Sequence, residues 1–228
     1  MSPLAGCQPD SEIETATKGI ETVAPAATFK RLIAVVAAIG TICVSLTAGA
    51  TGAAASGSTC PGTTSYPFAQ FGDANPYVLV PGGSFEGKTT GWTLTGAAKV
   101  VSGNETFLVN SSADTKSLSI PAGASATTPA ICVTFWNPTI RFFATGGSST
   151  SGLRVDVITT LPGGTVVTQQ IATISSSGSW SATPATYFFA NLLAPLSGGT
   201  TNVQFRFTPL GGTGFKIDDL YIDPRKGV

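Results

Sequence analysis

The stretch GLRVDVITT, residues 152–160, decides the fold class of this chain. Leu153, Val155 and Val157 alternate along it with side chains of the opposite parity. Successive side chains of a strand point to opposite faces of a sheet, so this period of two predicts one buried face and one solvated face. The stretch NVQFRFT, residues 202–208, alternates in the same way. Two sheets must then pack against each other to cover their apolar sides, which predicts an all-β, two-sheet antiparallel sandwich.

Turn signals divide the rest of the chain into short segments. Gly supplies positive φ at turns, and Pro fixes the entry to them. Apolar, β-branched and aromatic runs between the turns predict strands at 77–80, 92–95, 98–102, 106–109, 116–120, 130–135, 139–144, 152–160, 164–173, 186–192, 202–208 and 214–223. We expect the turns at 162–164 and 210–214 each to close a hairpin between the flanking strands.

The composition excludes several classes of function. The 228 residues carry a formal net charge of +0, which argues against a nucleic-acid partner because such a partner requires a basic face. The chain has no histidine, so the commonest general base and the Ser-His-Asp and Cys-His arrangements are missing. Glycoside cleavage needs two carboxylates about 5 to 9.5 Å apart, and a regular strand would turn the neighbours Asp218 and Asp219 to opposite faces. We therefore expect no enzymatic activity.

Residues 1–55 form a polar leader followed by a secretory signal segment. The basic pair Lys30–Arg31 precedes an apolar run over residues 32–46, and small residues with A-x-A sites follow. This order is typical of a helical signal segment, with cleavage expected after Ala50 or Ala55, and it predicts a secreted domain with no membrane contact afterwards. The alternative is an uncleaved membrane anchor, because the apolar run is nearly long enough to span a bilayer. In both cases the domain lies outside the cytoplasm.

Two cysteines remain after the leader. Cys60 belongs to an irregular arm, residues 56–76, and Cys132 to the sandwich domain, residues 77–228. In an exported domain this pair predicts one disulfide, which ties the arm to the strand near Val133. Closing so long a loop contributes about 4 kcal/mol in the chain-entropy model. The alternative is two unpaired thiols.

Two motifs stand at the ends of the expected sandwich. GSFEG, residues 83–87, is followed by GWTL at 91–94, and the final strand reads FKIDDLYID over 215–223. Here the chain resembles the jelly-roll carbohydrate-binding modules with a galactose-binding-like fold, which open on G-F-E-x-G and G-W and close on an aromatic-x-I-D-D strand. The resemblance covers about residues 77–224. It implies a jelly-roll sandwich that binds glycan without catalysis, and it places Trp92 in the core.

The same resemblance implies one structural calcium ion. In that family an early Glu and an Asp of the closing strand hold the ion, and Glu86 with Asp218 or Asp219 matches these positions. Ca²⁺ takes roughly six to eight oxygen ligands, so backbone carbonyls would complete its shell. The alternative is a solvated strand end, in which the two aspartates pair with Lys216 or Arg225.

The closing strand also predicts a change of register. Ile217 has odd parity, whereas Leu220 and Ile222 have even parity. If all three are buried, the strand must shift at Asp218–Asp219, as a β-bulge would make it do. Such a bulge would turn carboxylates toward an ion.

Sugar binding combines flat aromatic faces with polar groups that contact hydroxyls. Trp136 lies in a turn between two strands, and Trp180 lies among small polar residues, so we expect Trp180 to be the more exposed ring. The alternative for both is core packing.

A second candidate surface is the polar side of the alternating strands. Arg141, Arg154, Asp156, Gln204 and Arg206 all point away from the apolar side, and neighbouring strands would gather them on one sheet. Arg offers a planar fork of donors and Asp offers acceptors, which suits sugar diols. The alternative is ordinary charge pairing on a solvated face.

Together these observations predict a secreted, monomeric, non-catalytic module for a polysaccharide or cell-surface glycan. The second hypothesis is a structural or adhesive domain of the cell envelope surface that has no small ligand. Exposed Trp180 and Trp136 rings beside polar groups would favour the first.

Overall fold

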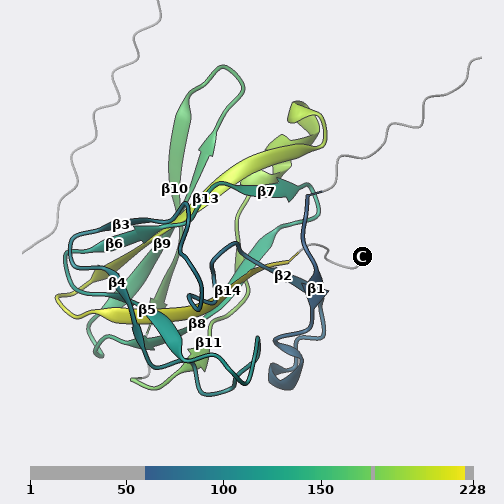
Figure 1. Ribbon diagram of the computed structural model, residues 1–228. Coiled ribbons are helices and arrows are strands. Elements are labelled where there is room, and N and C mark those ends of the chain that lie inside the picture. Colours follow the sequence, from purple (N-terminus) through teal and green to yellow (C-terminus); the bar gives the residue numbers. More distant parts are fainter. Residues whose placement is uncertain (1–59, 176–177, 224–228) are drawn as a thin grey trace, which may run out of the picture. The chain divides into compact units, whose positions relative to one another are not determined.

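The computed structural model describes residues 60–175 and 178–223, so the expected signal segment and the leader boundary lie outside the described residues. The described chain folds into two antiparallel sheets that pack face to face (Figure 1). The eight-stranded sheet contains β1 (Thr64–Ser65), β2 (Tyr77–Leu79), β4 (Lys99–Ser102), β5 (Lys116–Ile120), β8 (Thr139–Gly146), β11 (Ser181–Ala182), β12 (Thr186–Tyr187) and β14 (Phe215–Ile222). The six-stranded sheet contains β3 (Thr93–Thr95), β6 (Ser125–Thr127), β7 (Ile131–Thr134), β9 (Gly152–Thr160), β10 (Val166–Ser175) and β13 (Thr200–Leu210).

Strands distant in sequence lie side by side in both sheets. The first sheet follows the order β1-β2-β14-β5-β4, with β8 paired to β14 and the short β11 and β12 paired to β8. The second follows β10-β9-β13-β6-β3, with β7 paired to β13. Two short 3-10 helices, η1 (Ala69–Phe71) and η2 (Ala190–Ser197), complete the described elements.

The core lies between the sheets, and the alternation that predicted it is confirmed. The inward side chains of β9 and β13 are all buried: Leu153, Val155, Val157, Val203, Phe205 and Phe207. Phe207 meets Phe142 of the other sheet edge to face, with ring centroids 5.2 Å apart. The predicted all-β sandwich is therefore the observed fold.

A second, smaller core lies on the far side of β8. Ile140 and Phe142 face the main core, but Phe143 is also fully buried, in a cluster with Phe68 and Tyr221. Phe68 belongs to the N-terminal arm and stacks on Phe143 with centroids 5.5 Å apart. The side of β8 that carries Arg141, expected to be a polar outer side, is thus not solvated, because the arm covers it.

The predicted disulfide between Cys60 and Cys132 is present, with Cα atoms 5.4 Å apart. It ties the start of the described arm to β7 across 72 residues of sequence. The arm packs so closely on β2 at Gly62 that a Cβ added there would collide with the Val78 side chain. A glycine at this position therefore allows the arm to pass close enough to β2 for Cys60 to reach Cys132.

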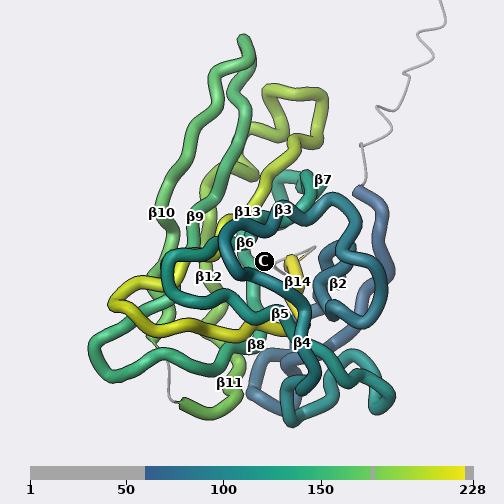
Figure 2. The backbone as a smooth tube through the Cα atoms, turned by 60° about the vertical axis from the view of Figure 1, so that its left-hand side comes forward, coloured from purple at the N-terminus to yellow at the C-terminus, as the bar shows by residue number. Residues whose placement is uncertain are grey.

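One predicted hairpin is confirmed and the other is wrong. β9 and β10 pair through the turn at 162–164 and project from the rest of the domain (Figures 1 and 2). β13 and β14 do not pair: β13 pairs with β6, β7 and β9, whereas β14 pairs with β2, β5 and β8. Residues 211–214 carry the chain from one sheet to the other. Turn residues specify a reversal of the chain but not which sheet it enters.

Two predicted strands are replaced by other structure. Residues 106–109 form a loop, because the N–H groups of Phe107 and Val109 donate to the Glu105 carboxylate instead of to a neighbouring strand. Within 186–192 the strand ends at Tyr187, and η2 begins at Ala190. The strand β6 was not predicted, because its three small residues carry no clear apolar pattern.

Candidate functional site

A row of polar side chains crosses five neighbouring strands on the outer face of the six-stranded sheet. In register, Gln170 of β10 lies opposite Asp156 of β9, which lies opposite Arg206 of β13. Arg206 lies opposite Thr127 of β6, which in turn lies opposite Thr93 of β3. Their sequence neighbours on β9 and β13 point into the core, so this row faces outward.

Asp156 is held between two arginines in the middle of this row. Arg206 donates to Asp156 Oδ2 from Nη2 at 2.9 Å and from Nε at 3.2 Å, and Arg154 Nη2 lies 3.2 Å from the same oxygen. The Asp156 side chain is only 3% exposed, whereas those of Arg154 and Arg206 are 35% and 32% exposed. Each guanidinium has five N–H donors, so the outward ones are available to a ligand. Such part-exposed pairs stabilise a fold only modestly, by about 1 kcal/mol or less, but they fix the orientation of the arginines.

Gln204 lies beside Arg206 on β13, two residues along the strand. Its Nε2 donates to the Thr128 carbonyl at 2.9 Å, which holds the side chain against the sheet. The outward positions of the five paired strands carry no aromatic side chain among the described residues. Recognition on this face would therefore rest on hydrogen bonds and not on ring stacking.

Arg141 does not belong to this surface. It lies on β8 of the other sheet, where Nη1 contacts Asp73 Oδ2 at 2.8 Å and Nε donates to the Thr183 carbonyl at 2.6 Å. Its guanidinium also lies 4.4 Å from the centre of the Phe68 ring. Arg141 thus ties the N-terminal arm to β8. Period-two alternation predicts which residues share a side of one strand, but not which sheet the strand joins.

The tryptophans differ from the expectation in their exposure. Trp136 is 50% exposed, whereas Trp180 is partly buried against the second core cluster, so the expected order of the two rings is wrong. Trp92 is buried as expected, and its Nε1 donates to the Pro81 carbonyl at 3.0 Å. Neither Trp136 nor Trp180 lies on the polar row.

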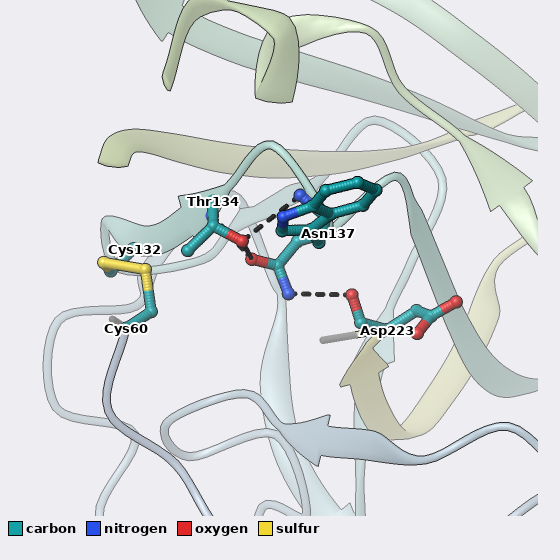
Figure 3. The surroundings of a disulfide bond; sticks show 6 residues. Cys60, Cys132, Thr134, Asn137 and Asp223 are labelled. Atoms are coloured by element: carbon teal, nitrogen blue, oxygen red, sulfur yellow. Dashed lines mark hydrogen bonds between the residues drawn. A yellow bond between two sulfur atoms is a disulfide. The ribbon is translucent and has the colours of Figure 1, made fainter. Parts of the chain in front are cut away.

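The turn that carries Trp136 is fixed by hydrogen bonds. Asn137 Oδ1 accepts from the Thr134 N–H at 2.5 Å and from its hydroxyl at 3.0 Å. Asn137 Nδ2 donates to the Asp223 carbonyl at 2.8 Å, and the Trp136 N–H donates to Thr134 Oγ1 at 3.2 Å (Figure 3). The exposed indole is therefore mounted on a tightly held backbone.

The closing strand shifts register at the predicted aspartates. Pairing of β14 with β8 is interrupted between Asp218 and Tyr221, and Asp219 has a φ of 47°. Ile217, Leu220 and Ile222 are all buried, which confirms the bulge expected from their opposite parities. Both aspartates are buried as well, so the alternative of a solvated strand end is wrong.

Asp219 is the least satisfied polar group of this region. Both of its carboxylate oxygens are buried and have no hydrogen-bond partner. The Asn110 N–H lies near enough to lower the pKa of Asp219 but makes no hydrogen bond of normal geometry with it. Asp218, by contrast, accepts from the backbone N–H of Glu105 at 3.0 Å and from that of Asp219 at 2.9 Å. A buried anion without donors is costly unless a cation compensates it.

Glu105 is a buried member of this group that sequence reasoning missed. It lies 113 residues before Asp218 and is brought there by the loop that replaces the expected strand at 106–109. Glu86, the matched residue of the family motif, instead holds the neighbouring loop: its Oε1 accepts from the N–H of Thr115 at 2.6 Å and of Lys116 at 2.5 Å. No local signal in the sequence distinguishes Glu105 from an ordinary turn residue.

The carboxylates of this region raise one another's pKa. Burial, and then the charges of Asp219 and Glu105, raise the pKa of Asp218 to about 8. Burial, followed by the charges of Glu105, Asp114 and Glu86, raises the pKa of Asp219 to about 7. Several carboxylates therefore surround one whose buried oxygens make no hydrogen bond, an arrangement that fits a cation. Among the described residues no three acidic or Cys side chains converge closely enough to hold a metal by themselves, so other oxygens would have to contribute. Asn104 Oδ1 is one buried oxygen without a partner.

Comparison with known proteins finds matches only among solved structures. The sequence matches no protein-family model, and no curated protein matches it. The CBM22-1–GH10 modules of Clostridium thermocellum endo-1,4-β-D-xylanase 10B, complexed with xylohexaose, align with a TM-score of 0.46 at 18% identity over 63% of this chain. The match spans only 28% of that longer chain.

Two further structures are single modules. TmCBM61 in complex with β-1,4-galactotriose has a TM-score of 0.39 at 17% identity, over 63% of this chain and 96% of its own. The CBM22-1 xylan-binding domain of Paenibacillus barcinonensis Xyn10C has a TM-score of 0.44 at 16% identity, over 64% and 93%. All three structures contain carbohydrate-binding modules, and none of the three alignments reaches a TM-score of 0.5.

Proposed function

We propose that this chain is a non-catalytic module that binds a polysaccharide or cell-surface glycan on the outer face of its six-stranded sheet. The observation that carries the proposal is Asp156 held between Arg154 and Arg206, with Gln204 beside them. Guanidinium donors and carboxylate or amide oxygens fixed on one rigid sheet suit the vicinal hydroxyls of a sugar. The opening and closing sequence motifs support the same class of ligand.

The buried carboxylates support a role without catalysis. Asp218, Asp219 and Glu105 are at most 1% exposed, so their oxygens cannot reach a glycosidic bond in a polymer outside the domain. On the proposed binding face the one carboxylate, Asp156, is paired with two arginines. A glycosidase requires a second carboxylate across from the first.

We also propose that the domain is secreted. The Cys60–Cys132 disulfide supports this, because structural disulfides persist in oxidising compartments. Within the part of the chain that the structure describes, no helix has the length and apolar character that a membrane crossing requires. The uncleaved N-terminal anchor remains the alternative, with the same domain outside the cytoplasm.

A structural Ca²⁺ ion is the cofactor that we propose. Asp219 would be its carboxylate ligand, while Glu86, Asp218 and Glu105 supply negative charge around it. The ion would neutralise the buried bulge of β14 and so stabilise the fold, without taking part in any reaction. The unpartnered oxygens of Asp219 support this proposal.

Titration of the purified protein with glycans tests the binding function. Xylohexaose and β-1,4-galactotriose serve as first probes in calorimetry, followed by a glycan array with and without chelator. We expect saturable binding, and a loss of about tenfold or more in affinity on Arg206→Ala. The control Lys99→Ala removes an exposed cation from the other sheet and should leave affinity unchanged. The proposed site would be refuted if no glycan on the array binds, or if Arg206→Ala and Lys99→Ala bind glycan with equal affinity.

A structural or adhesive surface domain is the second candidate. Exposed apolar side chains around η2 favour it, since Phe189 is 63% exposed and Leu196 is 73% exposed. If no glycan on the array binds and chelator does not change the melting temperature, the structural or adhesive domain is the function that remains.

A further inference from the structure

A cavity of about 1030 Å³ lies where the N-terminal arm meets β2 and β7. Its walls include arm residues 60–63, residues 78–81 at the end of β2, and the turn with Phe135 and Trp136. The disulfide between Cys60 and Cys132 borders it beside this turn (Figure 3). This volume lies at the upper end of the range of small-molecule sites, which is roughly 300 to 1,000 Å³. The cavity shares no residue with the polar row described above, and Asn202 of its lining lies two residues before Gln204 on β13.

The lining of this cavity excludes charged ligands. None of the described residues that line it is an Asp, Glu, Lys or Arg. Three of them, Pro61, Pro81 and Pro195, lack a backbone N–H donor. Val78 and Ile131 add aliphatic surface. A charged group would lose its hydration here without gaining a partner.

Part of the polar lining is engaged within the protein. The amide of Asn137 contacts Thr134 and the Asp223 carbonyl, and the Thr134 hydroxyl contacts Asn137 and the Trp136 N–H. The other polar side chains of the lining are the indole N–H of Trp136, Thr63 and Asn202. A sugar carries hydroxyls on most of its carbons and would leave many of them without partners in such a site. The cavity therefore offers a glycan few hydrogen-bond partners compared with the polar row.

Apolar surface continues from the cavity to the solvent. Phe135 and Trp136 line it and are 42% and 50% exposed, with ring centroids 5.0 Å apart. The Phe135 carbonyl accepts from Asn191 Nδ2 at 2.6 Å, which fixes the rim to η2. An elongated apolar ligand that extends from the cavity past these rings would bury more surface than a compact one.

We propose that this cavity binds the uncharged acyl chain of a small amphiphile, whose polar end lies in solvent at the Phe135–Trp136 rim. The lack of charge, the aliphatic and proline side chains of the lining and the apolar rim all favour this class of ligand. The arm forms one wall, so binding also depends on the disulfide that holds Cys60 against β7.

Binding of the uncharged fluorescent probe N-phenyl-1-naphthylamine to the oxidised full-length protein tests this proposal, with 1-monolauroylglycerol as competitor. Ala130 is exposed and lines the cavity, so the larger side chain of Ala130→Trp should occupy part of it, whereas Ala97→Trp makes the same change at an exposed turn elsewhere. We expect saturable probe binding that monolauroylglycerol displaces, an affinity about tenfold or more weaker in Ala130→Trp, and no change in Ala97→Trp. Equal melting temperatures of the two variants would show that both fold.

Other occupants appear as distinct outcomes of the same experiment. Displacement of the probe by xylohexaose or β-1,4-galactotriose would assign the cavity to glycan and overturn the proposal. Probe binding that appears only after residues 224–228 are deleted would show that the chain's own end fills the cavity. Binding to phosphatidylcholine vesicles that Ala130→Trp retains, without competition by monolauroylglycerol, would assign the apolar rim to a bilayer instead. Glycan binding at Arg206 is tested separately by Arg206→Ala, so failure of the acyl-chain proposal and failure of the proposed function can be told apart.

Discussion

Arg206 faces Asp156 directly across the β9–β13 ladder and donates to its Oδ2 from both Nε and Nη2. Arg154, two residues from Asp156 on the same strand, contacts the same oxygen. One buried carboxylate therefore orients two part-exposed guanidinium groups on the outer face of the sheet. This arrangement makes Asp156 both a structural anchor and the organiser of the proposed ligand surface.

Asp156→Ala should weaken both stability and glycan binding. The substitution leaves two cations without their partner, and because both arginines are about one-third exposed we expect a loss of about 1–2 kcal/mol in the free energy of unfolding. Glycan affinity should fall by about tenfold or more, since neither guanidinium keeps its orientation. Urea unfolding and calorimetry measure the two effects. Unchanged glycan affinity would show that the ligand does not use this face.

Arg141→Ala should lower stability without changing glycan affinity. Its pair with Asp73 is mostly buried, and removal of one partner from a buried pair costs about 3–5 kcal/mol, with loss of the Phe68 contact in addition. The expected result is a lower urea midpoint of unfolding with unchanged binding to any glycan that the array identifies. If the folded Arg141→Ala variant loses affinity for glycan, Arg141 takes part in the ligand site after all.

Stability in the absence of calcium should fall as pH rises. The folded-state pKa values of Asp218 and Asp219 are raised to about 8 and about 7, so the folded state binds protons more tightly than the unfolded state. Their contribution is complete below about pH 4 and is lost progressively as pH rises through these two values. Thermal unfolding in chelator across this window measures the slope. A melting temperature in chelator that does not change with pH would contradict the raised pKa values of Asp218 and Asp219.

Excess Ca²⁺ should reverse this loss at alkaline pH. A ligand that binds only the folded state raises the melting temperature, and ion binding should release protons from the aspartates near pH 7. Asp219→Asn should abolish the calcium effect and reduce the pH dependence, because the amide carries no charge at any pH whereas Asp218 still titrates. As a control, Lys99→Ala should behave like the parent protein. Full calcium stabilisation of Asp219→Asn would place any ion elsewhere.

Reduction of the disulfide should destabilise the fold and open the cavity. The bond closes a loop across 72 residues, so its loss should cost about 4 kcal/mol in the chain-entropy model. Cys132→Ser should reproduce this loss, and added reductant should then have no further effect on the urea midpoint. If reductant lowers the stability of Cys132→Ser as much as that of the parent, the effect is not due to this bond.

The sequence alone determined the fold class and the local features of single strands. Alternation over 152–160 and 202–208 predicted which side chains are buried, because side-chain direction follows from strand geometry without knowledge of the partner strand. The opposite parities of Ile217 and Leu220 predicted the bulge of β14 for the same reason. Cysteine usage predicted the disulfide, because the chain after the expected leader offers only one pair.

Only the tertiary structure decided which of these features meet. It placed Arg141 on a different sheet from Arg206 and β14 in a different sheet from β13. It also brought Glu105 to Asp218, 113 residues later in the sequence. It also buried Phe143 beneath the N-terminal arm and left Trp136, instead of Trp180, half exposed. A strand pattern encodes the direction of each side chain, whereas strand order and loop paths depend on packing between segments that are distant in sequence. The acidic group around Asp219 and the cavity at the disulfide arise from that packing, so no local sequence motif predicts them.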